Sequence, residues 1–168
     1  IFGRSGSGKS SLLLWAMHGR KRDGLPFAWI DMQVYAQRED RRVFLDVLLD
    51  VLEQTHDAVS NRALAIGLSV RVQKLRDARK DPAEQDLRRL LPDLKRLFGS
   101  LSNASTDLVL FLDDFHVLDP SLQPHLLHFL YGFARGTRVF LKVSAIETFT
   151  KLWDAATRTG LEVPHDVQ

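Results

Sequence analysis

The sequence predicts an α/β fold in which helices cover a mostly parallel sheet, and three observations support this prediction. Five consecutive apolar residues, 108–112, are followed by two aspartates. Continuous apolar runs of this kind are typical of central strands in parallel sheets, which are buried on both faces. Strand-length and helix-length segments alternate along the chain, as in βαβ units. A glycine-rich stretch, GRSGSGKSS at residues 3–11, stands at the start of one helical segment.

Each element is predicted from its own local pattern. The predicted strands are PFAWIDM after a Gly/Pro turn, the apolar run LVLFLDDF, and RVFLKVSAI, at residues 26–32, 108–115 and 138–146. The predicted helices have apolar residues at helical spacing and lie at residues 8–18, 41–54, 81–99 and 119–136, with a weaker pattern at 58–80. Three acidic residues in the second helix form a narrow stripe that is expected to face water: Asp46, Asp50 and Glu53.

Helix ends are predicted from capping and breaking residues. Asp81 and Asp119 are candidate N-caps, each followed by a proline that suits a first helical turn. Gly19 and Gly136 are expected to end helices, and Pro92 to kink or split the helix that contains it.

Length and composition are those of one soluble domain. The chain has 168 residues, of which 45% are hydrophobic and 26% charged, and no apolar run approaches the roughly 20 residues that a membrane helix needs. We expect one core domain over 1–168 that is cropped at both ends, with most of its first strand, its last core strand and any lid outside the sequence. The absence of cysteine excludes disulfides and thiolate metal sites and favours a cytoplasmic location.

Charge is unevenly distributed along the chain. The net charge is +2, but residues 1–100 carry 18 Lys and Arg against 13 Asp and Glu, whereas residues 101–168 carry 5 against 8. Basic residues cluster at 18–22 and within 71–96. These clusters are candidates for contact with phosphate backbones, but acids are interleaved through the second cluster, as on a solvated helix face.

The glycine-rich stretch matches G-x-x-x-x-G-K-[ST], the phosphate-binding P-loop. Its glycines allow a tight turn whose N–H groups cradle an anion, and the following helix adds its N-terminal donors. The lysine supplies a positive charge at the β- and γ-phosphates, and the serine hydroxyl that follows suits Mg²⁺. The predicted nucleotide-binding residues are Gly3, Arg4, Ser5, Gly6, Ser7, Gly8, Lys9, Ser10 and Ser11.

Strand ends supply the other predicted site residues. Asp113 follows the apolar run and is the predicted Mg²⁺ ligand together with Ser10, while Asp114 is predicted to orient or deprotonate an attacking water. Ser144 falls at the carboxyl end of the next strand, where open α/β sheets gather ligand contacts. Lys9, Asp114 and Ser144 are therefore the predicted catalytic residues.

Four segments, GRSGSGKSS, FAWIDMQVY, LVLFLDDFHVLD and FLKVSAIETF, together resemble the nucleotide-binding core of the additional-strand P-loop ATPases. More narrowly, they resemble bacterial AAA+-type relatives of the origin-recognition initiator ATPases, with STAND-type NTPases next nearest. The resemblance implies a three-layer P-loop NTPase fold with a five-stranded parallel sheet, in which the P-loop strand and the Asp113 strand flank the Ser144 strand. It also implies ATP rather than GTP. Residues 144–147 read Ser-Ala-Ile-Glu, so the basic residue common after this strand in such relatives is missing.

The predicted function is ATP binding and Mg²⁺-dependent ATP hydrolysis, which couples nucleotide state to conformational change or assembly. DNA, a second copy of the chain and other domains of a longer chain remain open as partners; a membrane is not expected. The alternative is a STAND-type switch that hydrolyses slowly or not at all, because Asp114 is one methylene shorter than the glutamate of many hydrolytic relatives. A small-molecule kinase and a non-catalytic nucleotide-binding module fit the sequence less well.

Overall fold

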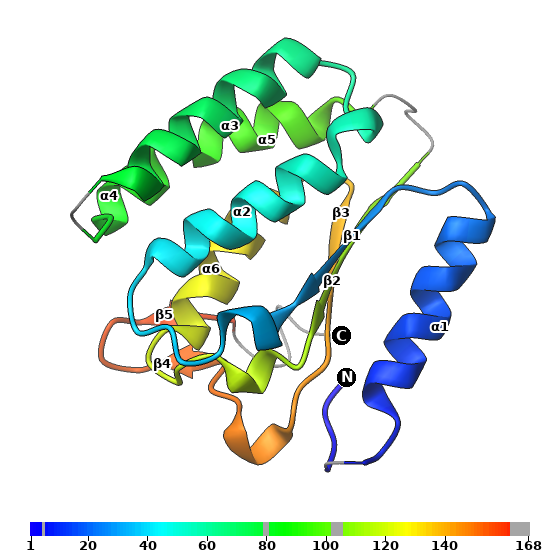
Figure 1. Cartoon of the computed structure of the whole chain (residues 1–168). Helices are drawn as coiled ribbons and strands as arrows, with labels where there is room; N and C mark the ends of the chain where they lie inside the picture. The colour runs from blue at the N-terminus through cyan, green and yellow to red at the C-terminus, as the bar shows by residue number, and fades with distance from the viewer. Residues whose placement is uncertain (5, 79–80, 102–105, 162–168) are drawn as a thin grey trace.

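Three parallel strands form the centre of the molecule. The computed structural model describes residues 1–4, 6–78, 81–101 and 106–161. Within them β1 (Phe27–Asp31), β2 (Leu108–Asp113) and β3 (Val139–Val143) form a sheet in the order β1-β2-β3 (Figure 1). Both pairs are parallel, and Asp31 pairs in register with Asp113. The predicted α/β class with a parallel sheet is confirmed.

The apolar run of the sequence forms the central strand. Residues 108–112 of β2 are all buried, whereas the outer strand β3 has an exposed face that carries Phe140 and Lys142. A strand with a neighbour on each side and helices on both faces has no position where a polar side chain reaches water. The first polar residue, Asp113, therefore comes where the strand leaves the core.

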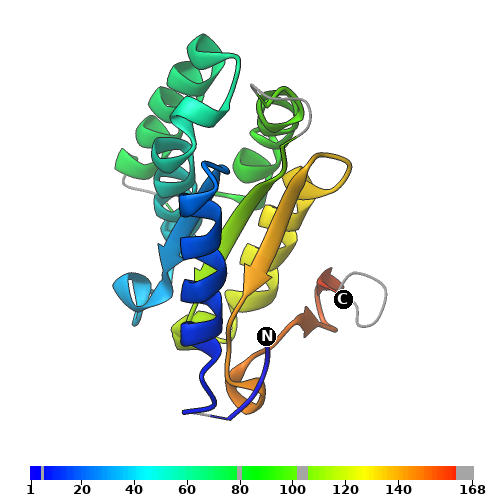
Figure 2. The ribbon, with the colours of Figure 1, turned by 90° about the vertical axis from the view of Figure 1, so that its right-hand side faces the viewer.

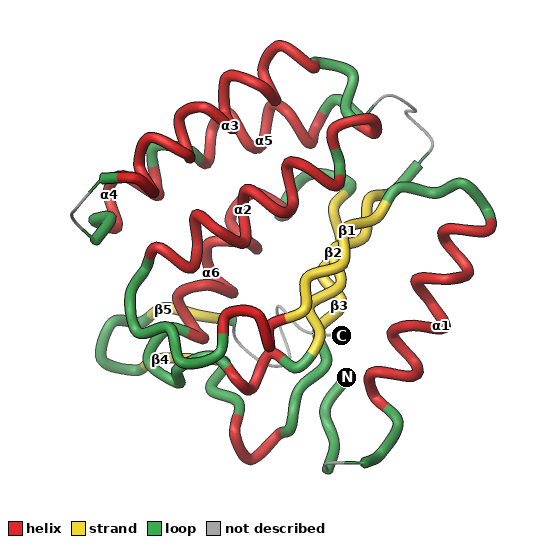
Figure 3. Tube along the Cα trace, in the orientation of Figure 1, coloured by secondary structure: helices red, strands yellow, loops and turns green. Residues whose placement is uncertain are grey.

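Helices cover the two faces of the sheet unequally. On one face lie α2 (Arg42–Gln54), α3 (Arg62–Asp77), α5 (Leu91–Gly99) and α6 (Gln123–Ala134), and α1 (Lys9–Arg22) lies on the other (Figures 1 and 2). The short α4 (Glu84–Arg88) precedes α5. Helix α1, the sheet and the pair α2 and α6 form three layers, and α3 and α5 pack on the outer side of α2 and α6, as a tube coloured by secondary structure shows (Figure 3).

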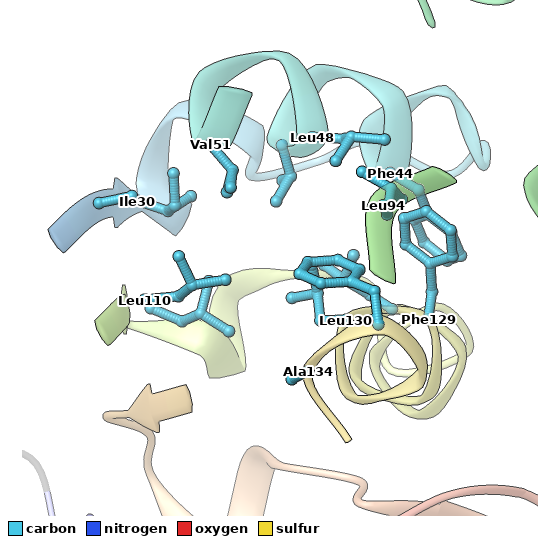
Figure 4. Close-up of a cluster of buried hydrophobic side chains, with 14 of the residues drawn as sticks. Ile30, Phe44, Leu48, Val51, Leu94, Leu110, Phe129, Leu130 and Ala134 are labelled. Atoms are coloured by element: carbon cyan, nitrogen blue, oxygen red, sulfur yellow. The ribbon is translucent and has the colours of Figure 1, made fainter. Parts of the chain in front are cut away.

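The main core lies between the sheet and the helices α2, α3, α5 and α6. Ile30 of β1 and Leu110 of β2 face α2 and α6, whose Phe44 and Phe129 rings stack with centroids 6.3 Å apart (Figure 4). Each fully buried side chain of this size contributes roughly 1.5–3 kcal/mol to stability. This packing fixes the sheet edge on which the predicted site residues stand.

The first helix ends later than predicted and packs on the sheet along one side. It continues through Gly19 to Arg22, because one glycine inside a helix costs only about 1 kcal/mol. Leu13 is its only buried apolar residue, and it packs on Val109 and Phe111 of β2. The sheet covers one side of the helix and leaves Trp15 75% exposed.

Helix starts are only partly as predicted. Pro92 does split its segment, since it lies in the first turn of α5. Asp81 caps no helix; its carboxylate accepts a hydrogen bond from the backbone N–H of Arg41 at 2.8 Å. Asp119 stabilises a turn by accepting from the Ser121 N–H at 2.8 Å, and α6 begins later, with Pro124 in its first turn.

The acidic stripe of α2 is also not uniformly exposed to solvent. Asp46 is only 9% exposed and pairs with Arg38 at 3.7 Å and with Arg76 of α3. Two guanidinium groups allow this carboxylate to be buried, since buried charges need partners. The ion pairs join α2 to α3 in a way that the spacing of residues along α2 does not reveal.

Residues before the P-loop lie beside β3. Phe2 forms a parallel bridge with Ala145, and the N–H of Ala145 donates to the Ile1 carbonyl at 3.1 Å. The Ser144 strand therefore lies between the Asp113 strand and the P-loop segment, in the order that the resemblance implies. The described residues contribute three strands and this bridge to the sheet rather than five strands. A separate antiparallel pair, β4 (Trp153–Asp154) and β5 (Thr159–Gly160), packs on α6 and was not predicted.

Candidate nucleotide-binding site

The P-loop connects the segment beside β3 to the first turn of α1. Gly6 and Gly8 have φ values of 76° and 79°, in the left-handed region that favours glycine. Gly8 is the N-cap of α1 and, without a side chain, leaves the N–H groups of the first turn free of a side-chain cap. Uncapped donors at a helix N-terminus attract anions. Gly3 is constrained differently, because an added Cβ would lie 3.0 Å from Ser7 Oγ.

Lys9 is held inside this loop rather than extended into solvent. Its side-chain ammonium donates to the carbonyl oxygens of Gly3 at 3.0 Å and Arg4 at 2.7 Å, and to Ser7 Oγ at 3.3 Å. The residue is 8% exposed. The loop therefore places a positive charge next to the uncapped start of α1, and both features favour phosphate. Arg4 and Ser11 are exposed, and Ser5 lies outside the described residues.

A hydrogen-bond cluster joins α1 to two strand ends. Ser10 Oγ donates to Asp113 Oδ1 at 2.9 Å, and Ser144 Oγ donates to the same oxygen. Ser144 is fully buried, and its hydroxyl also accepts from the backbone N–H of Asp114 at 3.1 Å. Residues separated by 103 and 31 positions in the chain thus meet at one carboxylate oxygen. The structure brings together Ser10, Asp113 and Ser144. Their roles in Mg²⁺ binding and catalysis stay predictions.

Asp114 stands beside this cluster in an unusual backbone conformation. Its φ of 54° and ψ of 39° are left-handed, which aspartate tolerates better than most residues. Its carboxylate accepts from the side-chain amide of Gln33 at 3.2 Å. Backbone strain of this kind concentrates at functional sites. The turn directs the two adjacent aspartates to different partners, Asp113 to two serines and Asp114 to Gln33.

A model of the family described as AAA ATPase domain matches residues 1–141. The chain belongs to this AAA ATPase family. Neither a curated protein nor a solved structure matches the chain. The matched range contains the P-loop, both aspartates and most of β3. Membership indicates a nucleotide-dependent activity with ATP as the ligand.

The donor set of the AAA domain suits a magnesium nucleotide. A serine hydroxyl and a carboxylate oxygen 2.9 Å apart are hard oxygen ligands of the kind that Mg²⁺ prefers. The P-loop that precedes this pair supplies an ammonium and free N–H groups for phosphate. Among the described residues no group of three or more His, Cys, Asp or Glu forms a separate metal site.

Gln33 is a site residue that the sequence analysis missed. It lies in the short 3-10 helix η1 (Met32–Tyr35) that follows β1, just as Asp114 follows β2. The two strands are paired in register up to Asp31 and Asp113, so residues just beyond both ends share one edge of the sheet. A polar residue immediately after the first predicted strand was the available signal. Its partner, 81 positions away, could not be read from the sequence.

The basic clusters are largely occupied by internal contacts. In the first cluster, the guanidinium of Arg20 donates to the Pro26 carbonyl at 3.0 and 3.1 Å and to that of Asp107. In the second, five arginines form ion pairs with nearby acids: Arg71, Arg76, Arg88, Arg89 and Arg96. Contact with DNA stays a prediction. No helix of the described residues is long and apolar enough to cross a membrane, and the cytoplasmic location also stays a prediction.

Proposed function

We propose that this AAA domain binds Mg-ATP, hydrolyses it, and passes its nucleotide state to a partner or a second domain. The observation that supports this most is the shared oxygen of Asp113, which accepts from Ser10 of the P-loop helix and from Ser144 of the neighbouring strand. A carboxylate in this position links phosphate binding to the sheet edge. A rearrangement of α1 around a nucleotide is thereby transmitted to the carboxyl ends of β2 and β3.

Each residue has a role that follows from its chemistry. The loop N–H groups and Lys9 bind the phosphates, and Ser10 and Asp113 are the protein ligands of Mg²⁺. The metal, when bound, neutralises charge that develops on the phosphate oxygens. Asp114 orients the attacking water and accepts its proton, while Ser144 fixes the Asp113 carboxylate and the Asp114 N–H. Catalysis then consists of positioning and electrostatic stabilisation.

A second candidate is a nucleotide switch with slow or absent hydrolysis. The geometry of Asp114 favours it, because this short carboxylate is already engaged by the amide of Gln33 at 3.2 Å. An aspartate held in this way is less free to reach a water than a longer glutamate. In this reading, exchange of ADP for ATP carries the signal, and the partner is another protein or another copy of the chain.

Phosphate release from Mg-ATP tests both candidates. We expect steady turnover by the wild type, and loss of turnover with retained ATP binding in Asp114→Asn, since the amide cannot accept a proton. Asp77→Asn is the matched control and should keep full turnover, because this carboxylate at the end of α3 accepts hydrogen bonds from Gln73 among the described residues. Assays with and without double-stranded DNA show whether nucleic acid is the coupled partner.

The outcomes separate the proposals. Tight ATP binding without phosphate release, with or without DNA, overturns hydrolysis and leaves the switch. Absence of ATP binding overturns both. Turnover that DNA does not change removes DNA as the stimulating partner and directs the search to proteins.

A further inference from the structure

The two loops that carry the catalytic residues are joined at a second point, away from Asp113. One loop follows β2 and contains the 3-10 helix η3 (Phe115–Val117); the other follows β3 and contains η4 (Glu147–Phe149). Both lie at the lower edge of the molecule in Figure 1, beyond the carboxyl ends of their strands. Near the strands the loops are joined by Ser144, whose carbonyl accepts from the Phe115 N–H at 2.9 Å.

Gln123 makes the second junction with a single side-chain amide. This first residue of α6 is fully buried. Its Nε2 donates to the Leu118 carbonyl at 2.7 Å, in the loop after β2, and its Oε1 accepts from the Lys151 N–H at 2.7 Å, in the loop after β3. Two longer contacts, to the carbonyls of His116 at 3.4 Å and Phe149 at 3.3 Å, again involve one loop each.

We infer that Gln123 is a positioning residue that locks the Asp114 loop to the Ser144 loop, so that both approach the nucleotide as one unit. This inference rests on the proposed ATP hydrolysis. A buried amide whose donor and acceptor are both used has no alternative partner in water, so the spacing of the two loops is set by the length of this side chain. Within the part of the chain that the structure describes, Gln123 has no hydrogen bond to the P-loop, to Asp113 or to Asp114. Its effect on catalysis is transmitted through the backbone of the two loops.

The first test separates turnover from binding. In Gln123→Met, which keeps the volume but removes both hydrogen bonds, we expect kcat to fall by about 10- to 100-fold, because small misplacements of catalytic groups cost this much. The dissociation constant of Mg-ATP should change less than about twofold, because the P-loop is untouched. Gln54→Met is the matched control: its amide also bonds backbone, at Trp29 N and O, but far from the two loops. Circular dichroism at the assay temperature must show that both variants are folded.

A second variant tests the role of Gln123 through the pH dependence of kcat. A general loss of stability would not change kcat alone with pH. In Gln123→Glu the protonated carboxyl can donate to Leu118 and accept from Lys151, as the amide does, whereas the ionised form places a charge against carbonyl oxygens. Burial raises the pKa of the introduced carboxyl. The kcat of this variant relative to wild type should therefore be nearest to one at low pH and fall as pH rises. Gln123 contacts backbone atoms of His116, Asp119 and Lys151, and these residues are present in both proteins. A pH dependence that the variant shows and the wild type lacks is therefore due to the introduced carboxyl.

Hydrogen exchange tests the lock independently of hydrolysis. In Gln123→Met the amides of 115–118 and of 145–151 should both exchange faster, while those of β1 do not change. Acceleration of only one loop, or an unchanged kcat in a folded variant that hydrolyses ATP as wild type, overturns the inference and leaves the proposed function intact. Absence of turnover in the wild type refutes hydrolysis, and the exchange result then decides the coupling of the loops alone.

Discussion

The two halves of the candidate site are held in place by different means. The P-loop half is local: two left-handed glycines and contacts of Lys9 with atoms no more than six residues away hold its described residues in place. The strand-end half depends on contacts between residues that are distant in the sequence. Hydrogen bonds join Asp113 to Ser10 and Ser144, and Asp114 to Gln33. The first half depends on residue types at fixed spacing, and the second on the register of a folded sheet.

This difference decides what each half can do. A local loop can keep its affinity for phosphate even when the rest of the domain shifts. The strand-end half changes whenever β1, β2 or β3 move relative to one another, since each strand supplies one partner. Under the proposed function, nucleotide binding depends mainly on the P-loop half and turnover on the strand-end half. Substitutions in the two halves should separate these two quantities.

The largest effect is expected from the local half. Lys9→Ala removes the only side chain of the described loop that brings a positive charge inside it, and we expect phosphate release to fall by at least about 100-fold together with a large loss of ATP affinity. Isothermal titration with Mg-ATP and a phosphate-release assay measure the two quantities. Lys142→Ala, an exposed lysine of β3, is the control. Wild-type affinity and turnover in Lys9→Ala would show that the loop does not hold the phosphates.

A smaller effect with a different signature is expected from the buried serine. Ser144→Ala removes a donor to Asp113 and leaves the Asp114 N–H without its acceptor. Unsatisfied buried groups cost about 1–3 kcal/mol, so urea unfolding should show a loss of this size, and kcat should fall about tenfold with ATP affinity nearly unchanged. Ser100→Ala, which removes a hydroxyl that in the described structure donates to the carbonyls of Arg96 and Leu97 in α5, should leave kcat unaltered. An equal loss of affinity and kcat would contradict the separation of the two halves.

The same contrast explains how much the sequence could predict. Strand β2 and the break at Pro92 are local patterns, and the structure confirms them. The P-loop is also a local pattern, and its role in phosphate binding stays a prediction. The later start of α6 comes from a local turn that Asp119 forms with Ser121. The burial of Asp46, in contrast, depends on a partner elsewhere in the fold, a guanidinium of α3. Gln33 and Gln123 belong to this second class. An isolated glutamine in a sequence carries no sign of the backbone or carboxylate that it will meet.

The smallest effect is expected at Gln33, whose side chain makes one exposed hydrogen bond in the strand-end half. Gln33→Ala removes the amide that donates to Asp114 at 3.2 Å, a single solvent-exposed hydrogen bond worth about 0.5–1.5 kcal/mol. If this bond holds Asp114 in the orientation used for hydrolysis, kcat falls about two- to fivefold while the ATP dissociation constant stays as in wild type. Gln85→Ala, an exposed glutamine of α4, controls for the loss of a surface amide. A rise in kcat would instead mean that the exposed amide of Gln33 keeps the Asp114 carboxylate from reaching water. Gln33 would then restrain hydrolysis, and the nucleotide switch would gain support over the hydrolase.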